Sequence, residues 1–518
     1  MSGPAWRLSS WWGEASPWPD LPALFTGRVE VEEIGEADFN DLIGSLVSAQ
    51  RGRSFLAWRD YRVVAELHSR LVGTESDPHD LLLVDGFADC AARIAISFGI
   101  GQGKAEQMVR EALALRNRLP RVAERLRDGR ISAERVTSII ARTDLVDGHD
   151  CAAEVDADIA ARLDLHEGAW SAERLRDMVD RIVYRHDPDA VRERRQKALD
   201  ARGVSTKPLP DGMAKFSATM SAENARLSDG SVKALAACAC EHDQRTTQQR
   251  RSDATFALLT GTAFECECGR EDCTAQIPEP GTVPPDSKVI IHVVVDESTL
   301  NGDADNAGFI AGHGVISDEH ARDLAGRPDA VIKPLVPKGT PQNPDGSFTL
   351  PAHLPSDPYR PTAALDTFVR VRDGSSVVPG SEVSAFDADL DHVEEFDHDD
   401  PSHGGQTLPD NLNAKHRFGH LLKTFGDWVD DQYRDRHGVL TTEFITPEGL
   451  VLPGDPENLE ILFPGLRRIR FKIPPGDDGQ PAEPGNEEAP TRAMTRVAAK
   501  HARRRQERER NRRRRERD

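Results

Sequence analysis

Five residues in the last third of the chain limit its possible folds more than any other feature of the sequence. Asp391 and His392 are adjacent, Asn411 follows 19 positions after His392, and His420 and Lys423 complete the set. A neutral imidazole is a suitable proton acceptor near pH 7. Carboxylate, amide and imidazole groups are ligands for a divalent cation. These residue types are therefore the ones that metal-assisted hydrolysis requires.

The order and spacing of these residues, with Gly404-Gly405 and Asn411-Leu412 between them, resemble the HNH nuclease motif. That motif is a small β-hairpin plus helix around one divalent cation. The resemblance implies that His392 is the general base and that Asn411 orients the loop or the base. It also implies that Asp391 and His420 bind Mg²⁺ or Mn²⁺, and that Lys423 approaches a phosphate.

One part of the nuclease pattern is missing. Most nucleases of this class brace the motif with a structural zinc ion, held by two pairs of cysteine-like ligands. The matching positions here are Ser376, Ser381, His416 and Gly419. A serine hydroxyl is a poor zinc ligand beside a thiolate, and glycine has no side chain. We therefore expect this zinc site to be lost, which leaves both retained catalysis and a non-catalytic role open.

A second candidate metal site is the cysteine cluster Cys266, Cys268 and Cys273, in which Gly269 allows a tight turn. Three thiols within eight residues are typical of a zinc-binding loop. The alternative is that these are three ordinary reduced cysteines in a loop. His292 lies alone in an apolar run and is expected to be a core histidine rather than a ligand. The candidates for a fourth zinc ligand are Cys238, Cys240, His242 and His292.

Apolar periodicity predicts that residues 35–200 are mostly helical, with Ser132 as the N-cap of one helix. Residues 204–209 and 213–220 flank an Asp-Gly turn and predict a β-hairpin. The β-branched run at 288–295 predicts a buried strand. Individual helices are expected at 104–118, 170–186, 189–202, 221–242 (with a break at Asp229-Gly230) and 246–260.

The predicted fold class is α+β. A large, mainly α-helical N-terminal domain with hairpin and strand additions precedes a small HNH-like ββα-metal domain and a disordered basic tail. The expected divisions are an N-terminal segment (1–34), a helical domain (35–300), a loop-rich connector (301–354), the nuclease-like domain (355–472), and a linker with an arginine-rich tail (473–518).

Taken together, short motifs spread along the chain resemble the actinobacterial 13E12-repeat family. They are Leu119-Pro-Arg-Val, Gly129-Arg-Ile-Ser, Asp211-Gly-Met-Ala, Gln248-Gln-Arg-Arg-Ser-Asp253, the Cys268–Cys273 pair, Tyr359-Arg-Pro-Thr, Arg370-Val-Arg-Asp-Gly374 and the nuclease motif. Members of that family pair a helical domain of unknown function with a C-terminal HNH nuclease. The resemblance covers roughly residues 35–470 and implies a DNA-cleaving or DNA-nicking enzyme of mobile-element origin.

Charge is distributed unevenly along the chain. Residues 491–518 carry 13 Arg or Lys against 4 Asp or Glu, whereas the whole chain has a net charge of −21. An acidic body repels nucleic acid, so any DNA contact must be local. The candidate DNA-contacting residues are Arg503, Arg504, Arg505, Arg512, Arg513, Arg514 and Arg515. The alternative is a solubilising tail that contacts nothing specific.

The composition predicts a cytoplasmic protein that does not span a membrane. The sequence has no apolar run of transmembrane length, and seven cysteines in 518 residues do not make a disulfide scaffold. The first twenty residues lack the pattern of a secretory signal. Three functions remain open: a metal-dependent endonuclease, a catalytically degenerate DNA-binding or assembly protein, and a scaffold that oligomerises through its helical half.

Overall fold

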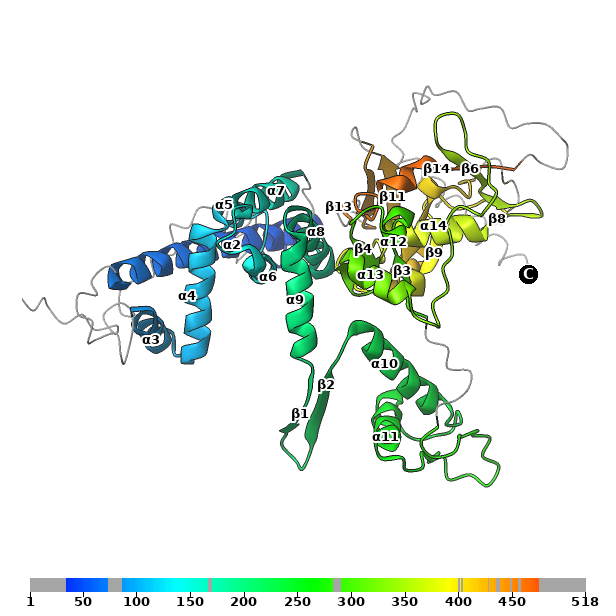
Figure 1. Ribbon diagram of the computed structural model, residues 1–518, viewed down its shortest axis with the longest axis horizontal. Coiled ribbons are helices and arrows are strands. Elements are labelled where there is room, and N and C mark those ends of the chain that lie inside the picture. Colours follow the sequence, from blue (N-terminus) through cyan, green and yellow to red (C-terminus); the bar gives the residue numbers. More distant parts are fainter. Residues whose placement is uncertain are drawn as a thin grey trace, which may run out of the picture. The chain divides into compact units, whose positions relative to one another are not determined.

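The computed structural model describes residues 34–72, 86–165, 170–282, 290–398, 401, 404–426, 428–434, 438–447, 450–454 and 458–474. The chain forms two compact units. Unit 1 combines residues 1–187 with residues 332–518, and unit 2 is the intervening stretch 188–331. The fold mixes helices and strands, and the N-terminal part is largely helical (Figure 1).

The first part of unit 1 is a group of helices (Figure 1). They are α2 (Phe39–Val72), α3 (Gly86–Phe98), α4 (Gln102–Asn117), α5 (Pro120–Arg127), α6 (Ala133–Thr143), α7 (Ala152–Leu165) and α8 (Ala172–His186), with a short 3-10 turn, Asp144–Val146. The long α2 packs against α3, α4 and α5. Leu119, Val122, Leu126, Val136 and Ile139 are all fully buried between these helices.

The helix boundaries follow local rules. Ser132 caps α6, because its side chain accepts a hydrogen bond from the backbone N–H of Arg135. Pro120 occupies the first turn of α5, where its missing N–H costs no helical hydrogen bond. The start at Ser132 agrees with the sequence prediction.

Helix α8 connects the two sequence segments of unit 1. Its charged residues Glu173, Arg174, Asp177, Asp180 and Arg181 are buried along with its apolar face. The guanidinium of Arg174 donates to the carbonyl oxygens of two residues far along the chain, one of them Asp373 at 2.5 Å. The C-terminal part of unit 1 therefore packs on this helix.

The C-terminal part of unit 1 alternates short strands and helices. The strands are β6 (Phe348–Pro351), β7 (His353–Leu354), β8 (Asp357–Pro361), β9 (Asp389–His392), β10 (Leu412–Lys415), β11 (Val429–Arg434), β12 (Leu440–Ile445), β13 (Val451–Pro453) and β14 (Ile469–Lys472). The helices are α14 (Ala363–Asp373) and α15 (Arg417–Phe425), with 3-10 turns at Ala385–Asp387, Pro409–Asn411 and Pro464–Arg468. Strands β11, β12 and β13 form an antiparallel sheet, whereas β14 pairs with β6 in parallel.

Unit 2 begins with α9 (Pro188–Asp200) and a hairpin of β1 (Gly203–Pro208) and β2 (Ala214–Thr219). Helices α10 (Ala222–Ala237) and α11 (Thr247–Thr260) then pack against each other. The remaining elements are α12 (Glu297–Asn301), α13 (Asp318–Ala325) and a small antiparallel sheet of β3 (Val293–Val294), β4 (Gly308–Ile310) and β5 (Gly314–Ile316).

Two sequence predictions for unit 2 differ from the structure. Helix α10 continues through Asp229 and Gly230, where a break was expected. Arg251 of α11 forms an ion pair with Asp229, so tertiary packing outweighs the low helix propensity of glycine. The buried strand expected at 288–295 is reduced to the two half-buried residues of β3, and residues 288–289 lie outside the described part of the chain.

None of the described helices combines the length and apolar character that a membrane-spanning helix needs.

Candidate functional site

The residues of the nuclease-like pattern lie on two paired strands and the helix that follows them. Strands β9 and β10 are antiparallel, with Leu412 opposite His392 and Lys415 opposite Asp389. Helix α15 begins directly after β10 and packs on both strands. This hairpin and helix bring the two sequence-distant parts of the pattern together.

His392 is held in one orientation. Its Nε2 atom lies 2.9 Å from the hydroxyl oxygen of Thr407, and its ring stacks on Tyr359 at 5.1 Å. The Thr407 hydroxyl donates to the carbonyl oxygen of Pro358 at 2.6 Å, so its oxygen accepts a hydrogen bond from the Nε2–H of His392. The neutral ring then keeps its lone pair on Nδ1. Burial lowers the pKa of His392 to about 4, which favours this neutral form at pH 7.

Asp391 belongs to a buried group of four charges. One of its oxygens, Oδ2, lies 2.7 Å from the ammonium of Lys415 and 3.0 Å from that of Lys423. The carboxylate of Asp430 contacts the same two ammonium groups, at 2.7 Å and 3.3 Å. Burial acts to raise the pKa of Asp391, but the two lysines outweigh it and hold the pKa below its usual value. We call these four residues the lysine–aspartate cluster.

His420 lies between two aspartates. Its Nδ1 atom is 3.1 Å from Asp389 Oδ2, and its Nε2 atom is 3.9 Å from Asp391 Oδ1. Hydrogen bonds from His420 and Arg417 lower the pKa of Asp389. A histidine that binds a metal commonly donates its other ring N–H to a carboxylate, and Asp389 is in position to accept it. The Nε2 lone pair then faces Oδ1 of Asp391, whereas the closest lysine contacts of this carboxylate are to Oδ2.

Asn411 fixes the loop between the two strands. Its side-chain oxygen accepts from the backbone N–H of Glu394 at 2.7 Å, and its amide donates to the carbonyl oxygen of Gln406 at 2.8 Å. A Cβ atom on Gly405 would lie 2.6 Å from the Asn411 amide nitrogen, so only glycine fits there. The Gly-Gly and Asn elements of the pattern therefore act together in one loop.

Lys423 is not on an exposed face. The side chain is buried, and its ammonium donates to the carbonyl oxygens of His392 and Val393 as well as contacting the two aspartates. A phosphate contact by Lys423 stays a prediction. The arginine-rich candidates from Arg503 to Arg515 lie outside the described residues.

Of the four positions that the nuclease resemblance assigns to zinc ligands, Ser376, His416 and Gly419 lie together, and His416 is the one zinc-binding residue type among them. The Ser376 hydroxyl is fully buried, lies 3.2 Å from His416 Nδ1, and accepts from the His416 backbone N–H at 3.1 Å. A Cβ atom on Gly419 would lie 2.7 Å from a methyl group of Val378, so this methyl group occupies the space of a side chain. We call the paired side chains of Ser376 and His416 the serine–histidine contact.

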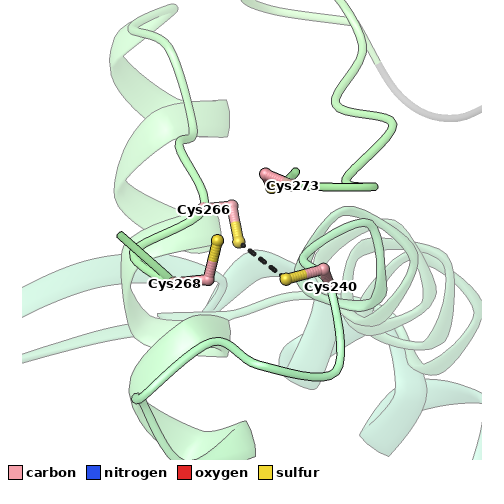
Figure 2. A group of neighbouring side chains, drawn as sticks. All are labelled: Cys240, Cys266, Cys268 and Cys273. Carbon is pink, nitrogen blue, oxygen red and sulfur yellow. Dashed lines mark hydrogen bonds between the residues drawn. The ribbon is translucent and has the colours of Figure 1, made fainter. Parts of the chain in front are cut away.

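The cysteine cluster gathers in unit 2, and its fourth member is Cys240. The sulfur atoms of Cys240, Cys266, Cys268 and Cys273 all lie within 4.8 Å of one another. Figure 2 shows these side chains converging, with a contact of 3.6 Å between Cys266 and Cys240. Four cysteines at these separations can hold a metal ion such as zinc. We call them the four-cysteine cluster.

The structure thus selects one of the four candidates for the missing ligand. The Cys238 thiol donates to the carbonyl oxygen of Ala234 inside its own helix, and neither His242 nor His292 belongs to the group. A backbone hydrogen bond from Arg270 lowers the pKa of Cys268, whereas burial raises the pKa of Cys240. The Cys-x-Cys spacing at 238–240 was the available sequence signal.

Three contributors to the nuclease-like region were not singled out from the sequence as site residues: Thr407, Lys415 and Asp430. Thr407 follows the Gly-Gly pair, but nothing in its spacing indicates a contact with a histidine 15 residues away. The burial of Lys415 could not be predicted from sequence periodicity, because it depends on an ion pair with Asp430, which lies on a later strand.

A family model described as "Domain of unknown function (DUF222)" matches residues 53–373 of this chain. The uncharacterized protein Rv3776 of Mycobacterium tuberculosis is 30% identical over 496 residues, which cover 90% of this chain and 89% of that protein. The uncharacterized protein Rv2100 of the same organism is 31% identical over 474 residues, covering 85% and 82%. No solved structure matches this chain.

Proposed function

The chain belongs to the DUF222 family, and for this member we propose a metal-dependent endonuclease that hydrolyses DNA phosphodiester bonds. The observation that carries the proposal is the position of His420 between Asp389, at 3.1 Å, and the Oδ1 atom of Asp391, at 3.9 Å. An imidazole nitrogen and a carboxylate oxygen that face each other in this way suit one divalent cation.

The donor set fits Mg²⁺ or Mn²⁺. Bonds of about 2.1 Å to two donors set those donors between about 3 and 4.2 Å apart, depending on the angle, and the distance between His420 Nε2 and Asp391 Oδ1 lies in this range. Lys415 and Lys423 fix the other oxygen of Asp391 and so orient the carboxylate. When bound, such an ion supplies a Lewis acid for the scissile phosphate and the leaving oxygen.

His392 is the proposed general base. Because the Nε2–H of His392 donates a hydrogen bond to Thr407, the lone pair lies on Nδ1, which is the proposed acceptor of a proton from an attacking water. Stacking on Tyr359 restricts rotation of the ring, and Asn411 holds the loop that carries Thr407 and the preceding Gln406. Each of these contacts would position the base without itself touching the substrate.

DNA is the proposed substrate on the basis of the nuclease-like pattern and the basic C-terminal sequence. The 13 Arg or Lys residues of 491–518 give the acidic chain one segment that attracts a phosphate backbone.

One observation favours a second candidate function, a catalytically degenerate DNA-binding or assembly protein. In the lysine–aspartate cluster the charge of Asp391 is already balanced by buried ammonium groups, which weakens its attraction for a cation. In that case DNA is bound but not cut.

Nicking of supercoiled plasmid separates the two functions. The wild type, His392→Ala and His392→Gln are incubated with Mg²⁺, Mn²⁺ or EDTA. The glutamine amide can still donate to Thr407, so this variant removes the base with little change of packing. The matched control is His149→Ala, which removes an exposed histidine paired with Asp187 in the helical part.

We expect metal-dependent nicking by the wild type and by His149→Ala, and a loss of about 10²- to 10⁴-fold in both His392 variants. Equal nicking by the wild type and a folded His392→Gln would refute the assigned base. Retention of plasmid in a gel shift, with no nicking under any condition, would favour the degenerate protein.

A further inference from the structure

We propose that the four-cysteine cluster binds one Zn²⁺ ion, and that this ion is the structural centre of the α10–α11 region of unit 2. The four sulfur atoms lie within 4.8 Å of one another, and one pair is 3.6 Å apart (Figure 2). Tetrahedral zinc with bonds of about 2.3 Å places its sulfur ligands about 3.8 Å apart. Small side-chain rotations therefore bring all four onto one ion.

The composition of the cluster indicates a closed site rather than a catalytic one. Four thiolates fill the coordination of a tetrahedral ion and leave no position for water or substrate. Thiolate sulfur is a soft ligand that selects zinc over Mg²⁺ or Mn²⁺. Each thiol releases its proton to solvent as its sulfur binds the ion. This site is thus chemically distinct from the oxygen and nitrogen donors near His420.

The cysteines are not oxidised partners in the structure. All four are free thiols, and the 3.6 Å between Cys240 and Cys266 is well beyond the bond length of about 2.05 Å in a disulfide. Two separate disulfides would also need the four sulfur atoms to divide into pairs, whereas they form one group.

Charged residues next to the cluster already hold its two chain segments together. Asp243 accepts a hydrogen bond from the backbone N–H of Glu267 at 3.0 Å, and Arg245 donates to the carbonyl oxygen of Glu265 at 2.6 Å. These contacts place Cys266 beside Cys240. Gly269 adopts a positive φ of 65°, which lets the chain turn back between Cys268 and Cys273.

The apolar core of this region is small. Four of its six buried residues are alanines, namely Ala236, Ala239, Ala254 and Ala257, and the others are Leu235 and Phe264. Residues 262–282 contain no helix or strand. A small core with a long irregular loop commonly depends on a disulfide or a metal ion for its stability.

The first test measures metal content in the full-length protein, purified under reducing conditions without added chelator. Native mass spectrometry and elemental analysis are compared for the wild type, Cys240→Ser and Cys273→Ser. The matched control is Cys238→Ser, which changes a cysteine two residues from Cys240 whose thiol bonds only within its helix. We expect one zinc per chain in the wild type and the control, and its loss in the other two.

The second test uses cobalt. Replacement of zinc by Co²⁺ gives the visible absorption of a tetrahedral thiolate site in the wild type and in Cys238→Ser. The band is expected to be absent in Cys240→Ser and unchanged in His420→Ala, which removes a donor of the other site only. Full cobalt–thiolate absorption in Cys240→Ser, or a wild type without zinc whose mass corresponds to a disulfide, would overturn the proposal.

A third readout reports the structural role. Arg270 is an exposed trypsin site between Cys268 and Cys273. Because cleavage needs local opening of the loop, we expect it to be roughly tenfold or more faster in Cys240→Ser, or after chelation, than in the zinc-loaded protein and in Cys238→Ser. Equal cleavage with and without zinc would show that the ion does not hold the loop.

Discussion

The serine–histidine contact in unit 1 and the four-cysteine cluster in unit 2 use opposite means to join separate chain segments. Ser376 and His416 satisfy each other by hydrogen bonds, and Val378 occupies the space beside Gly419. The four cysteines bring four thiols together, and thiols form only weak hydrogen bonds with one another. Side-chain contacts alone stabilise the serine–histidine contact, whereas the four-cysteine cluster reaches its full stability, on our proposal, only with a bound zinc ion.

The nearby lysine–aspartate cluster strengthens this contrast. Its two ammonium and two carboxylate groups balance to zero charge in the interior of unit 1. A protein interior accepts buried charge when it is paired and hydrogen-bonded in this way. Unit 1 can thus keep the shape of its candidate site in the absence of metal. The loop of unit 2 that carries three of the four cysteines is not expected to keep its shape without zinc.

The largest expected effect is the response to a strong chelator under reducing conditions. Structural zinc contributes on the order of 10 kcal/mol to the folding of small zinc-binding peptides, so amide hydrogen exchange in α11 and residues 262–282 should accelerate by several orders of magnitude. Exchange in α14 and α15 should stay unchanged. Equal acceleration in both places would contradict the contrast between the two units.

The next effect concerns the lysine–aspartate cluster. Lys415→Met leaves Asp391 and Asp430 with one buried ammonium group between them, and breaking a buried ion pair from one side costs about 3–5 kcal/mol. Urea denaturation measures the loss. The exposed Lys472→Met is the control and should change stability by less than about 0.5 kcal/mol. A Lys415→Met protein as stable as this control would mean that the cluster contributes nothing.

Asp177 on α8 is a buried carboxylate that lacks the close ion pairs of the lysine–aspartate cluster. The nearest guanidinium nitrogen, from Arg176, lies 3.8 Å away, and burial raises the pKa of Asp177 to about 7. The folded protein therefore binds a proton that the unfolded chain releases near pH 4, and its stability falls as the pH rises towards 7.

Asp177→Asn removes this dependence. Relative to the wild type, we expect it to gain at most about 3 kcal/mol between pH 5 and pH 8. Melting temperatures of both proteins at the two pH values measure this gain. If the difference in melting temperature between the variant and the wild type were the same at both pH values, or smaller at pH 8, Asp177 would not be the group with the raised pKa.

The smallest expected effect is in the serine–histidine contact. Ser376→Ala leaves the buried N–H of His416 without its acceptor, which costs about 1–3 kcal/mol. Ser381→Ala is the matched control, because the Ser381 hydroxyl accepts only one long hydrogen bond, from Val383 at 3.4 Å. Thermal unfolding of the two variants should differ by this amount, and identical curves would refute the bracing role of Ser376.

Local features of the fold were predictable from the sequence because local chemistry determines them. Ser132, Pro120 and the Asp211-Gly212 turn sit where capping and turn rules place them. Three of the four clustered cysteines were predicted together for the same reason, since they lie in one loop.

Long-range pairing was not predictable. Cys240 was one of four possible fourth ligands, and only the packing of α10 on α11 selects it. Lys415 looks like a surface residue in the sequence, yet it is buried because Asp430 on a later strand lies 2.7 Å from it. No periodicity rule joins residues on separate strands in this way.

The bond between Arg174 and the carbonyl oxygen of Asp373 has a consequence for synthesis. The two residues are 199 positions apart, with the whole of unit 2 between them. At about 5–20 residues per second a ribosome needs roughly 10–40 s to make that interval. During this time Arg174 cannot form its bond to Asp373, so the nascent chain can finish unit 2 before unit 1, although unit 1 begins first.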